Sequence, residues 1–195
     1  VTDIIRIPQC PSLFLGTKTI ATWACVEDFI RLYTGFFGWG RGPGAVDNYH
    51  GYARYDGMVF ASYLNGAGTE IIRNNVIAPA GTVKLGQWAH YAFVYDGNPT
   101  NITISFYKNG VLAGTPYTST NGVSTNSSMT AIGSQEDLPN PNYVRVFSGV
   151  MDDYRVYNRA LASNEIAGLY AELHVPSGDT TAPGTSPSGP PSAIS

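Results

Sequence analysis

The sequence predicts an all-β protein, a two-sheet antiparallel sandwich that carries one short helix near its C-terminus. Short stretches of alternating apolar and polar residues recur along the chain, with turn signals at intervals of about 8–12 residues. Glycine (22 residues) and tyrosine (13) are abundant, as expected of many short strands joined by tight turns. With 195 residues, 43% of them apolar, the chain can form one sizeable core and a tail.

The first residues are predicted to form a strand, a turn and a second strand. Ile5 and Ile7 alternate with Arg6, and Pro8 ends this strand because proline cannot donate a hydrogen bond to a ladder. The second strand is expected over residues 19–26.

The next strands surround a strong hairpin signal. Residues 31–44 predict a strand that runs into a glycine-rich loop. Residues 49–55 and 58–64 are expected to pair about Asp56-Gly57, a favoured turn dipeptide. A further strand is predicted over residues 70–76.

The middle of the chain contains the most apolar strand. Residues 85–97 are almost continuously apolar, which predicts a strand covered on both faces. Residues 102–107 alternate, and Asn109-Gly110 predicts a type I′ turn into the next strand. A short strand follows over residues 129–133.

Residues 147–157 alternate again and predict the closing strand. The alternation places Asp152 on the same face as Tyr154 and Val156, and the apolar character of these two residues indicates that this is the core face. Asp153 falls on the other face.

A short amphipathic helix is predicted directly after this strand. Leu161, Ile166 and Leu169 recur at helical spacing. Ser163 is the expected N-cap, and Glu165 lies in the first turn, where the helix dipole favours an anion.

These segments resemble the laminin-G-like, concanavalin-A-like jelly rolls. The family's closing pattern, G-x-I-D-D/E-V-R-I-Y-N-R-A-L-S-x-x-E-I, is matched over residues 149–166. Its opening is matched over residues 3–26, and its central W-x-H-V-A-x-V-Y-D-G strand over residues 88–97. The resemblance implies a concanavalin-A-like jelly roll over residues 1–175. The family also has a strand ending in F-D-G before this opening, which a longer chain or another segment is expected to supply.

The composition changes abruptly near the C-terminus. Sixteen of the twenty residues from 176 to 195 are Pro, Gly, Ser or Thr. Such a segment cannot bury enough apolar surface to fold alone, so it is predicted to be a linker or an extended arm. Its last residues, GPPSAIS, resemble the entry into a fibronectin-type-III-like module.

Charge and hydropathy exclude several classes of partner. The net charge of −3 gives no electrostatic reason to expect nucleic acid or an anionic membrane. No run approaches the roughly 18 apolar residues of a membrane helix.

Cys10 and Cys25 are the only cysteines, and their spacing fits neither a CxxC redox motif nor a zinc motif. In a loop-rich β protein an even count predicts one disulfide, provided that the protein is extracellular. The alternative is two buried free thiols.

The sequence argues against catalysis. The resemblance includes glucanases whose E-x-D-x-x-E pattern supplies two carboxylates on one strand face, and this pattern is absent here. Asp152 and Asp153 are neighbours, so they leave opposite faces of a strand and cannot act as a pair. Only acids from separate strands, such as Asp56, Glu70 and Glu136, could form a catalytic pair.

The resemblance also implies a structural calcium ion between the closing strand and the N-terminal segment. Asp152 is the expected ligand, with Asp153 or Asp3 as further ligands. The alternative is that Asp152 accepts hydrogen bonds from the backbone or from an arginine without a metal.

Carbohydrate binding is the commonest role of such modules, and it requires exposed aromatic rings beside polar side chains. Within residues 49–55, alternation places Tyr55 with Tyr49, and it places His50 and Tyr52 on the face expected to meet solvent. For the aromatic residues among the candidates, core packing is an equally open alternative. The predicted sugar-binding residues are Trp39, Arg41, Asp47, Asn48, Tyr52 and Arg54.

Together these features predict a non-catalytic carbohydrate-binding or adhesion module of a larger secreted or surface protein. Its expected partner is a polysaccharide or glycoconjugate at an extracellular or cell-surface location. The alternative is a structural subunit of an extracellular filament or surface fibre, which would bind other copies through its sheet edges or C-terminal arm.

Overall fold

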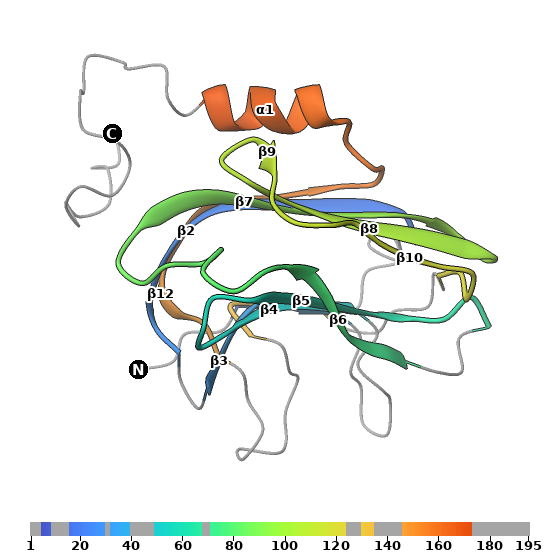
Figure 1. Cartoon of the computed structure of the whole chain (residues 1–195), viewed down its shortest axis with the longest axis horizontal. Coiled ribbons are helices and arrows are strands. Elements are labelled where there is room, and N and C mark those ends of the chain that lie inside the picture. Colours follow the sequence, from blue (N-terminus) through green and yellow to red (C-terminus); the bar gives the residue numbers. More distant parts are fainter. Residues whose placement is uncertain are drawn as a thin grey trace.

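A computed structural model describes residues 5–8, 16–29, 32–39, 49–67, 71–123, 130–134 and 146–172. Within these ranges the chain forms two antiparallel sheets and one helix, which confirms the predicted sandwich (Figure 1). Sheet A has the strand order β1 (Ile5–Ile7), β11 (Thr130–Ile132), β3 (Tyr33–Trp39), β4 (Tyr49–Arg54), β5 (Val59–Leu64) and β6 (Ile71–Ala78). Sheet B has the order β10 (Tyr117–Ser119), β8 (Asn101–Lys108), β7 (Trp88–Asn98), β2 (Lys18–Asp28) and β12 (Ser148–Tyr157), while β9 (Val111–Leu112) pairs with β8. The helix is α1 (Ser163–Glu172), and the predicted linker lies outside the described residues.

Strand β7 is apolar on both faces because both faces of sheet B are covered. Tyr91, Phe93 and Tyr95 point between the sheets and belong to the main core. Ala92 and Val94 point the other way and pack in a second cluster with residues of α1. In Figure 1, α1 lies over the side of sheet B that faces away from sheet A.

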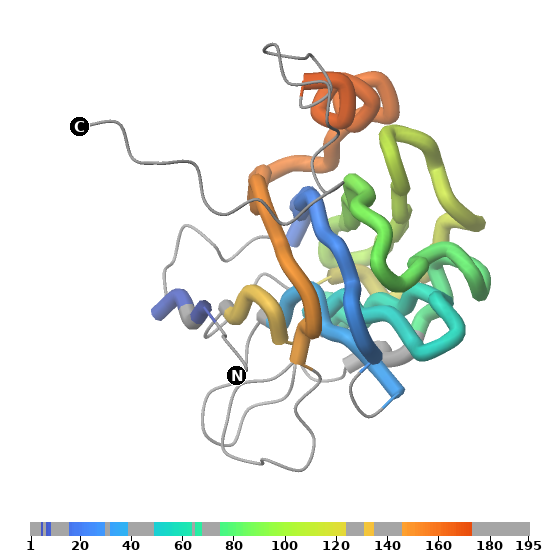
Figure 2. The backbone as a smooth tube through the Cα atoms, turned by 90° about the vertical axis from the view of Figure 1, so that its left-hand side faces the viewer, coloured from blue at the N-terminus to red at the C-terminus, as the bar shows by residue number. Residues whose placement is uncertain are grey.

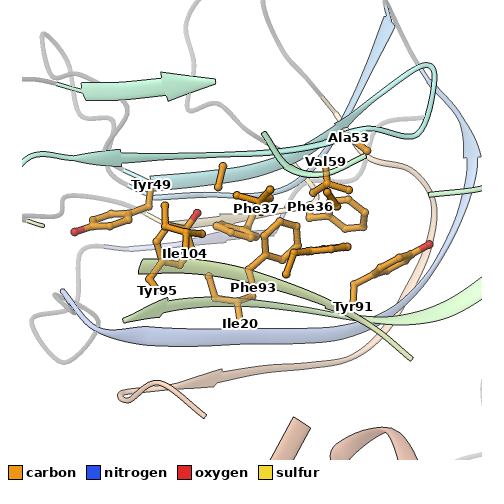
Figure 3. Packing of buried hydrophobic residues seen from close by; sticks show 14 of the residues in the cluster. Ile20, Phe36, Phe37, Tyr49, Ala53, Val59, Tyr91, Phe93, Tyr95 and Ile104 are labelled. Atoms are coloured by element: carbon orange, nitrogen blue, oxygen red, sulfur yellow. The ribbon is translucent and has the colours of Figure 1, made fainter. Parts of the chain in front are cut away.

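The main core depends on a β-bulge in β3. The ladder between β3 and β4 skips Phe36, so Phe36 and Phe37 both turn inward, and neither is exposed. Both rings meet Phe93 of the opposite sheet, at centroid distances of 5.6 Å and 5.0 Å (Figure 3). One bulge therefore gives the core two successive aromatic rings where plain alternation would give it one.

Lys18 is also fully buried, at one end of this core. Its ammonium nitrogen lies 3.2 Å from the centroid of the Tyr49 ring, whose electron-rich face attracts a cation. Burial lowers the pKa of Lys18 well below its ordinary value.

The helix begins with a cap that differs from the prediction. The side chain of Glu165 accepts a hydrogen bond from the Ala162 backbone N–H at 2.8 Å, so the predicted cap at Ser163 is wrong. The Ser163 hydroxyl instead lies 3.2 Å from the Tyr107 hydroxyl of β8. Glu165 also forms a two-pronged ion pair with Arg159, and together these contacts lower its pKa to about 2.

The closing strand contains an irregularity that alternation did not predict. The register between β12 and β2 shifts between Asp152 and Arg155, and Asp153 has a left-handed φ of 49°. Asp152 is exposed, so its predicted place on the core face is wrong. Met151 packs against the core with Tyr154 and Val156 instead.

The predicted disulfide is not formed in this structure. Cys25, on β2 opposite the first residue of β7, is a buried free thiol with 8% of its surface exposed. The other cysteine, Cys10, lies outside the described residues.

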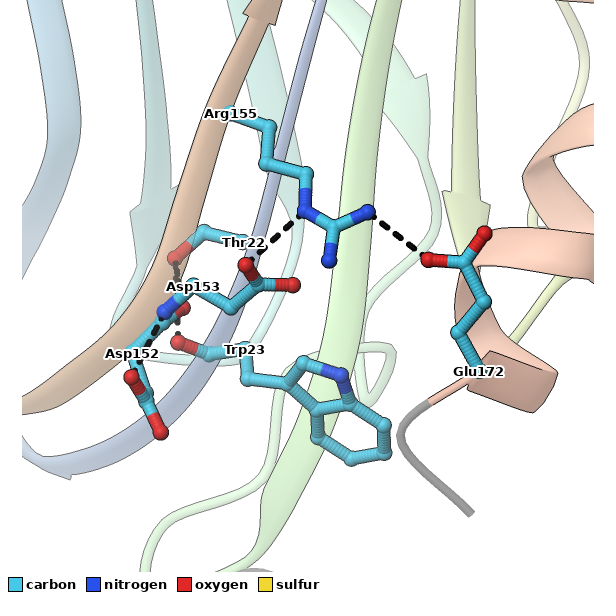
Figure 4. Close-up of polar contacts among 6 residues, drawn as sticks. All are labelled: Thr22, Trp23, Asp152, Asp153, Arg155 and Glu172. Atoms are coloured by element: carbon cyan, nitrogen blue, oxygen red, sulfur yellow. Dashed lines mark hydrogen bonds and ion pairs between the residues drawn. The ribbon is translucent and has the colours of Figure 1, made fainter. Parts of the chain in front are cut away.

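An aromatic group under α1 joins the helix to sheet B. The ring of Trp23 lies 5.6 Å from that of Tyr170 and 5.7 Å from that of His90. Beside this group Arg155 connects strand and helix, because its guanidinium donates to Asp153 at 2.8 Å and to Glu172 at 2.9 Å (Figure 4). His90 lies beneath α1 beside Trp23 and Tyr170, with 2% of its surface exposed.

Burial lowers the pKa of His90 to about 4, although the nearby Asp153 opposes the shift. An unfolded histidine titrates near pH 6.5, so the unfolded chain binds more protons between about pH 6.5 and 4. We expect the melting temperature to fall as the pH is lowered through this window. A His90→Gln variant should lose that part of the dependence in thermal melts, and an equal slope in both proteins would contradict the assignment.

Candidate functional site

The face of sheet A that points away from sheet B carries a row of aromatic side chains. We call Tyr33, Tyr52 and Phe60 the aromatic row. Tyr52 pairs with Phe60 across β4 and β5, and their rings stack at 5.2 Å with an interplanar angle of 7°. Tyr33 meets Tyr52 edge-on at 5.6 Å. None of the three belongs to either core cluster, so the row is a separate structure on the opposite face.

Tyr52 is not exposed. His50 and Tyr52 are each 1% exposed, so the expectation that they face solvent is wrong. The stacked ring of Phe60 and the edge of Tyr33 occupy the surroundings of the Tyr52 ring. In this arrangement Tyr52 holds the row together, and its ring faces are not available for a sugar.

Arg54 borders the aromatic row and forms a two-pronged ion pair with Asp56. Their nitrogen–oxygen distances are 3.0 Å and 2.5 Å, and the Arg54 side chain remains 32% exposed. The hydrogen bond from Arg54 holds the pKa of Asp56 below its usual value. The guanidinium carbon also lies 5.6 Å from the centroid of the Phe60 ring, so the positive charge of Arg54 lies directly beside the aromatic row.

Tyr55 lies beside this ion pair and is 58% exposed. Its ring centroid is 5.7 Å from the guanidinium carbon of Arg54. Its backbone N–H donates to Leu32, which is also 58% exposed, at 2.8 Å. We call Leu32, Arg54, Tyr55 and Asp56 the Tyr55 rim.

The backbone of this rim is held by several hydrogen bonds. Gly57 donates to Arg54, and Gly81 donates to the carbonyl of Asp56, each at 2.7 Å. Gly57 has a φ of 77°, which favours glycine at this turn. The Asp56-Gly57 dipeptide predicted the turn. The assumed alternation, however, was continued past Arg54, where β4 ends, and it therefore placed Tyr55 on the same face as the buried Tyr49.

The remaining predicted sugar-binding residues are only partly described. Trp39 lies at the end of β3, where it pairs with Tyr49 and Thr130. Arg41, Asp47 and Asn48 lie outside the described residues. Of the predicted residues whose side chains the structure describes, Arg54 belongs to the Tyr55 rim and Tyr52 to the aromatic row.

The predicted calcium ligands do not form a cluster in the part of the chain that the structure describes. An Asp152 carboxylate oxygen accepts the Asp153 backbone N–H at 2.7 Å, which is one form of the metal-free alternative (Figure 4). Asp153 is paired with Arg155, and Asp3 lies outside the described residues. No group of three or more His, Cys, Asp or Glu that could hold a metal occurs within the described ranges. Calcium binding therefore stays a prediction.

The described carboxylates also bear on catalysis. Asp56 forms an ion pair with Arg54, while Glu70 and Glu136 lie outside the described residues.

No described helix has the length and apolar character needed to span a membrane.

Comparison with known proteins identifies the family. Residues 2–167 match the family model of the concanavalin A-like lectin/glucanases superfamily. The chain belongs to this superfamily. The jelly-roll class implied by the sequence motifs is thereby confirmed, together with the two sheets described above. No curated protein sequence matches the chain.

Three solved structures show how widely this fold is used. The carbohydrate-binding module CBM40 of the Ruminococcus gnavus IT-sialidase, bound to α2,3-sialyllactose, is 16% identical with a TM-score of 0.64, over 86% of this chain and 96% of that one. Domain 4 of a GH43 extracellular arabinanase from Geobacillus stearothermophilus, in complex with arabinotriose, is 23% identical with a TM-score of 0.56, over 86% and 72%. The binding domain of botulinum neurotoxin serotype G is 13% identical with a TM-score of 0.57, over 87% of this chain and 40% of that one. At these identities the likeness establishes the fold alone.

The structure separates the roles of two neighbouring tyrosines, and this can be tested by stability. We expect Tyr52→Ala to lose about 3–5 kcal/mol of unfolding free energy, because it removes a buried, stacked ring. Tyr55→Ala should change it by no more than about 0.5 kcal/mol, because that ring is exposed. Urea denaturation measures both. Equal losses in the two variants would contradict the assignment.

Proposed function

We propose that the chain is a non-catalytic carbohydrate-binding module of a larger extracellular or cell-surface protein. Membership of a lectin/glucanase superfamily supports this proposal, as do the two similar modules with bound glycans. The single observation that carries it is the Tyr55 rim, where an exposed aromatic ring lies beside a guanidinium and a carboxylate.

This combination suits the chemistry of a sugar ring. The C–H face of a pyranose or furanose packs on an aromatic ring, here Tyr55. Its hydroxyls would accept hydrogen bonds from Arg54 and donate to Asp56. Because these two side chains already hold each other in place, less side-chain entropy is lost when the sugar binds.

Glycan binding should depend on the exposed ring. We expect a glycan array with plant, algal and bacterial polysaccharides to yield a ligand. Its affinity should fall about tenfold or more in Tyr55→Ala, a loss of at least about 1.4 kcal/mol. Val111→Ala, which truncates another exposed side chain on β9, is the matched control and should bind normally.

An array without any ligand would overturn the proposal, and so would equal binding by Tyr55→Ala. Sustained release of reducing sugar by the pure protein would contradict its non-catalytic part. That part is supported by the engagement of Asp153 with Arg155 and of Asp56 with Arg54, which leaves neither acid free to transfer protons.

A structural calcium ion is a separate part of the proposal. Asp152 is the best-suited ligand, because its carboxylate is exposed and its described contact is a single hydrogen bond to a neighbouring N–H. Asp153 is already neutralised by Arg155, so a site would need further oxygen ligands, such as Asp3 or backbone carbonyls.

If calcium binds there, chelator should lower the melting temperature by several degrees, and Asp152→Asn should remove this difference. Glu172→Gln is the control. It neutralises another exposed acid, which pairs with the Arg155 guanidinium, and should keep the difference in melting temperature. Identical melting curves with calcium and with chelator would exclude the site.

A further inference from the structure

The Tyr55 rim also indicates which class of sugar it can take, an inference that rests on the proposed carbohydrate binding. The side chains of the rim carry no net charge, because the Arg54 guanidinium and the Asp56 carboxylate offset each other. Within the described part of the chain, Arg54 is the charged side chain that acts on the Asp56 carboxyl. The rim therefore offers fixed hydrogen-bonding groups without an electrostatic preference for an anion.

The ion pair also occupies the edge of the guanidinium that binds a carboxylate best. Arg54 donates through Nε and Nη2 to the two carboxylate oxygens of Asp56, at 3.0 Å and 2.5 Å. This two-pronged geometry is the one by which arginine binds carboxylates most strongly. The Met58 backbone N–H, which donates to Asp56 Oδ1 at 3.1 Å, holds the carboxylate in place. An acidic sugar would have to displace Asp56 or bind beside a like charge.

Neutral hydroxyl groups meet no such obstacle. The Arg54 guanidinium has further N–H donors on Nη1, and Asp56 Oδ2 accepts a single described hydrogen bond, which leaves it a lone pair. A sugar hydroxyl can use either group without breaking the ion pair. The hydrogen bond from Arg54 holds the pKa of Asp56 below its usual value, so this acceptor stays ionised in mildly acidic solution.

Leu32 adds a second exposed apolar side chain to the rim. Tyr33 pairs with Arg54 at the end of the ladder between β3 and β4. The hydrogen bond from the Tyr55 N–H to the Leu32 carbonyl extends this ladder by one pair, so Leu32 lies opposite Tyr55. Each of the two is 58% exposed. A single exposed apolar residue needs no explanation, but two that lie opposite each other beside fixed polar groups suit a ligand with an apolar face.

The backbone of Leu32 is unusual. Its φ is 76°, a left-handed value that a bulky residue rarely adopts. The conformation is held on both sides, because the Leu32 N–H donates to the Phe29 carbonyl at 3.2 Å and the Leu32 carbonyl accepts from Tyr55. Residues held in such conformations cluster at ligand-binding sites. Glycine or asparagine would fit this φ with less strain, so the leucine side chain is the feature that calls for a function.

We propose that the Tyr55 rim selects an uncharged sugar whose ring packs on Tyr55 and whose methyl group packs on Leu32, which makes Leu32 a specificity-determining residue. The simplest such ligand is a 6-deoxyhexose. It has a methyl group where a hexose has a hydroxymethyl group and a uronic acid has a carboxylate. Against Leu32 a hydroxymethyl group would lose hydrogen bonds to water, and a carboxylate would in addition face Asp56.

The three substituents can be compared on one sugar ring. The probes are the methyl glycosides of the 6-deoxyhexose, the hexose and the uronic acid in the gluco, galacto and manno series, as both enantiomers. Binding to the full chain is followed by the NMR shifts of the Tyr55 and Gly57 backbone amides. In at least one series the 6-deoxy sugar should bind about fourfold more tightly than the hexose, the effect of one buried methyl group. The uronic acid should bind about tenfold more weakly than the hexose.

Two variants separate the causes of these preferences. Leu32→Asn keeps a residue that tolerates a left-handed φ but removes the apolar surface, so it should abolish the preference for the 6-deoxy sugar over the hexose. Asp56→Asn keeps a favoured turn dipeptide with Gly57 and frees Arg54 for a carboxylate. The uronic acid should therefore bind this variant about tenfold more tightly than it binds the unaltered protein.

Val111→Asn, at another exposed apolar residue, is the matched control for Leu32→Asn. In Figure 2, β9 lies beside α1 and away from the cyan hairpin of β4 and β5. This variant should keep both preferences.

Equal affinity for the three sugars of every series would overturn the proposal, as would tightest binding of a uronic acid. A 6-deoxy preference that survives in Leu32→Asn, or a uronic acid that gains nothing in Asp56→Asn, would also contradict it. If none of the probes binds, the proposal fails. A ligand of another class that depends on Tyr55 on the glycan array would then leave the carbohydrate proposal standing, whereas an array without any ligand would overturn both.

Discussion

The constraint on which this structure depends is that the central strands of sheet B need cover on both faces. Sheet A supplies one cover through Phe36 and Phe37, which a single bulge turns inward onto Phe93. Helix α1 supplies the other through Ile166 and Leu169. The apolar residues on both faces of β7 therefore require a three-layer arrangement, in which the short helix covers one face of sheet B as sheet A covers the other.

On the outer face of sheet A, no described helix or sheet packs as α1 packs on sheet B. The candidate site lies on this uncovered side of the sandwich. The outer aromatic residues pack against one another, with Tyr52 between Tyr33 and Phe60. Beyond this row β4 ends at Arg54, and the exposed ring of Tyr55 lies beside the Arg54–Asp56 ion pair. A ligand that needs an exposed ring and fixed polar groups therefore meets sheet A at its rim, not across its face.

The sequence predicted what depends on local chemistry. The Asn109-Gly110 turn forms with positive φ at both residues, 52° and 77°, and the helix follows the closing strand as expected. The errors about Asp152 and Tyr55 share one physical cause, namely that alternation assumes an unbroken pleat. A bulge after Asp152 and a strand end at Arg54 each change the face of the following residues. The burial of Tyr52 depends on rings from the two neighbouring strands, Phe60 of β5 and Tyr33 of β3, and alternation along a single strand does not register such cross-strand contacts.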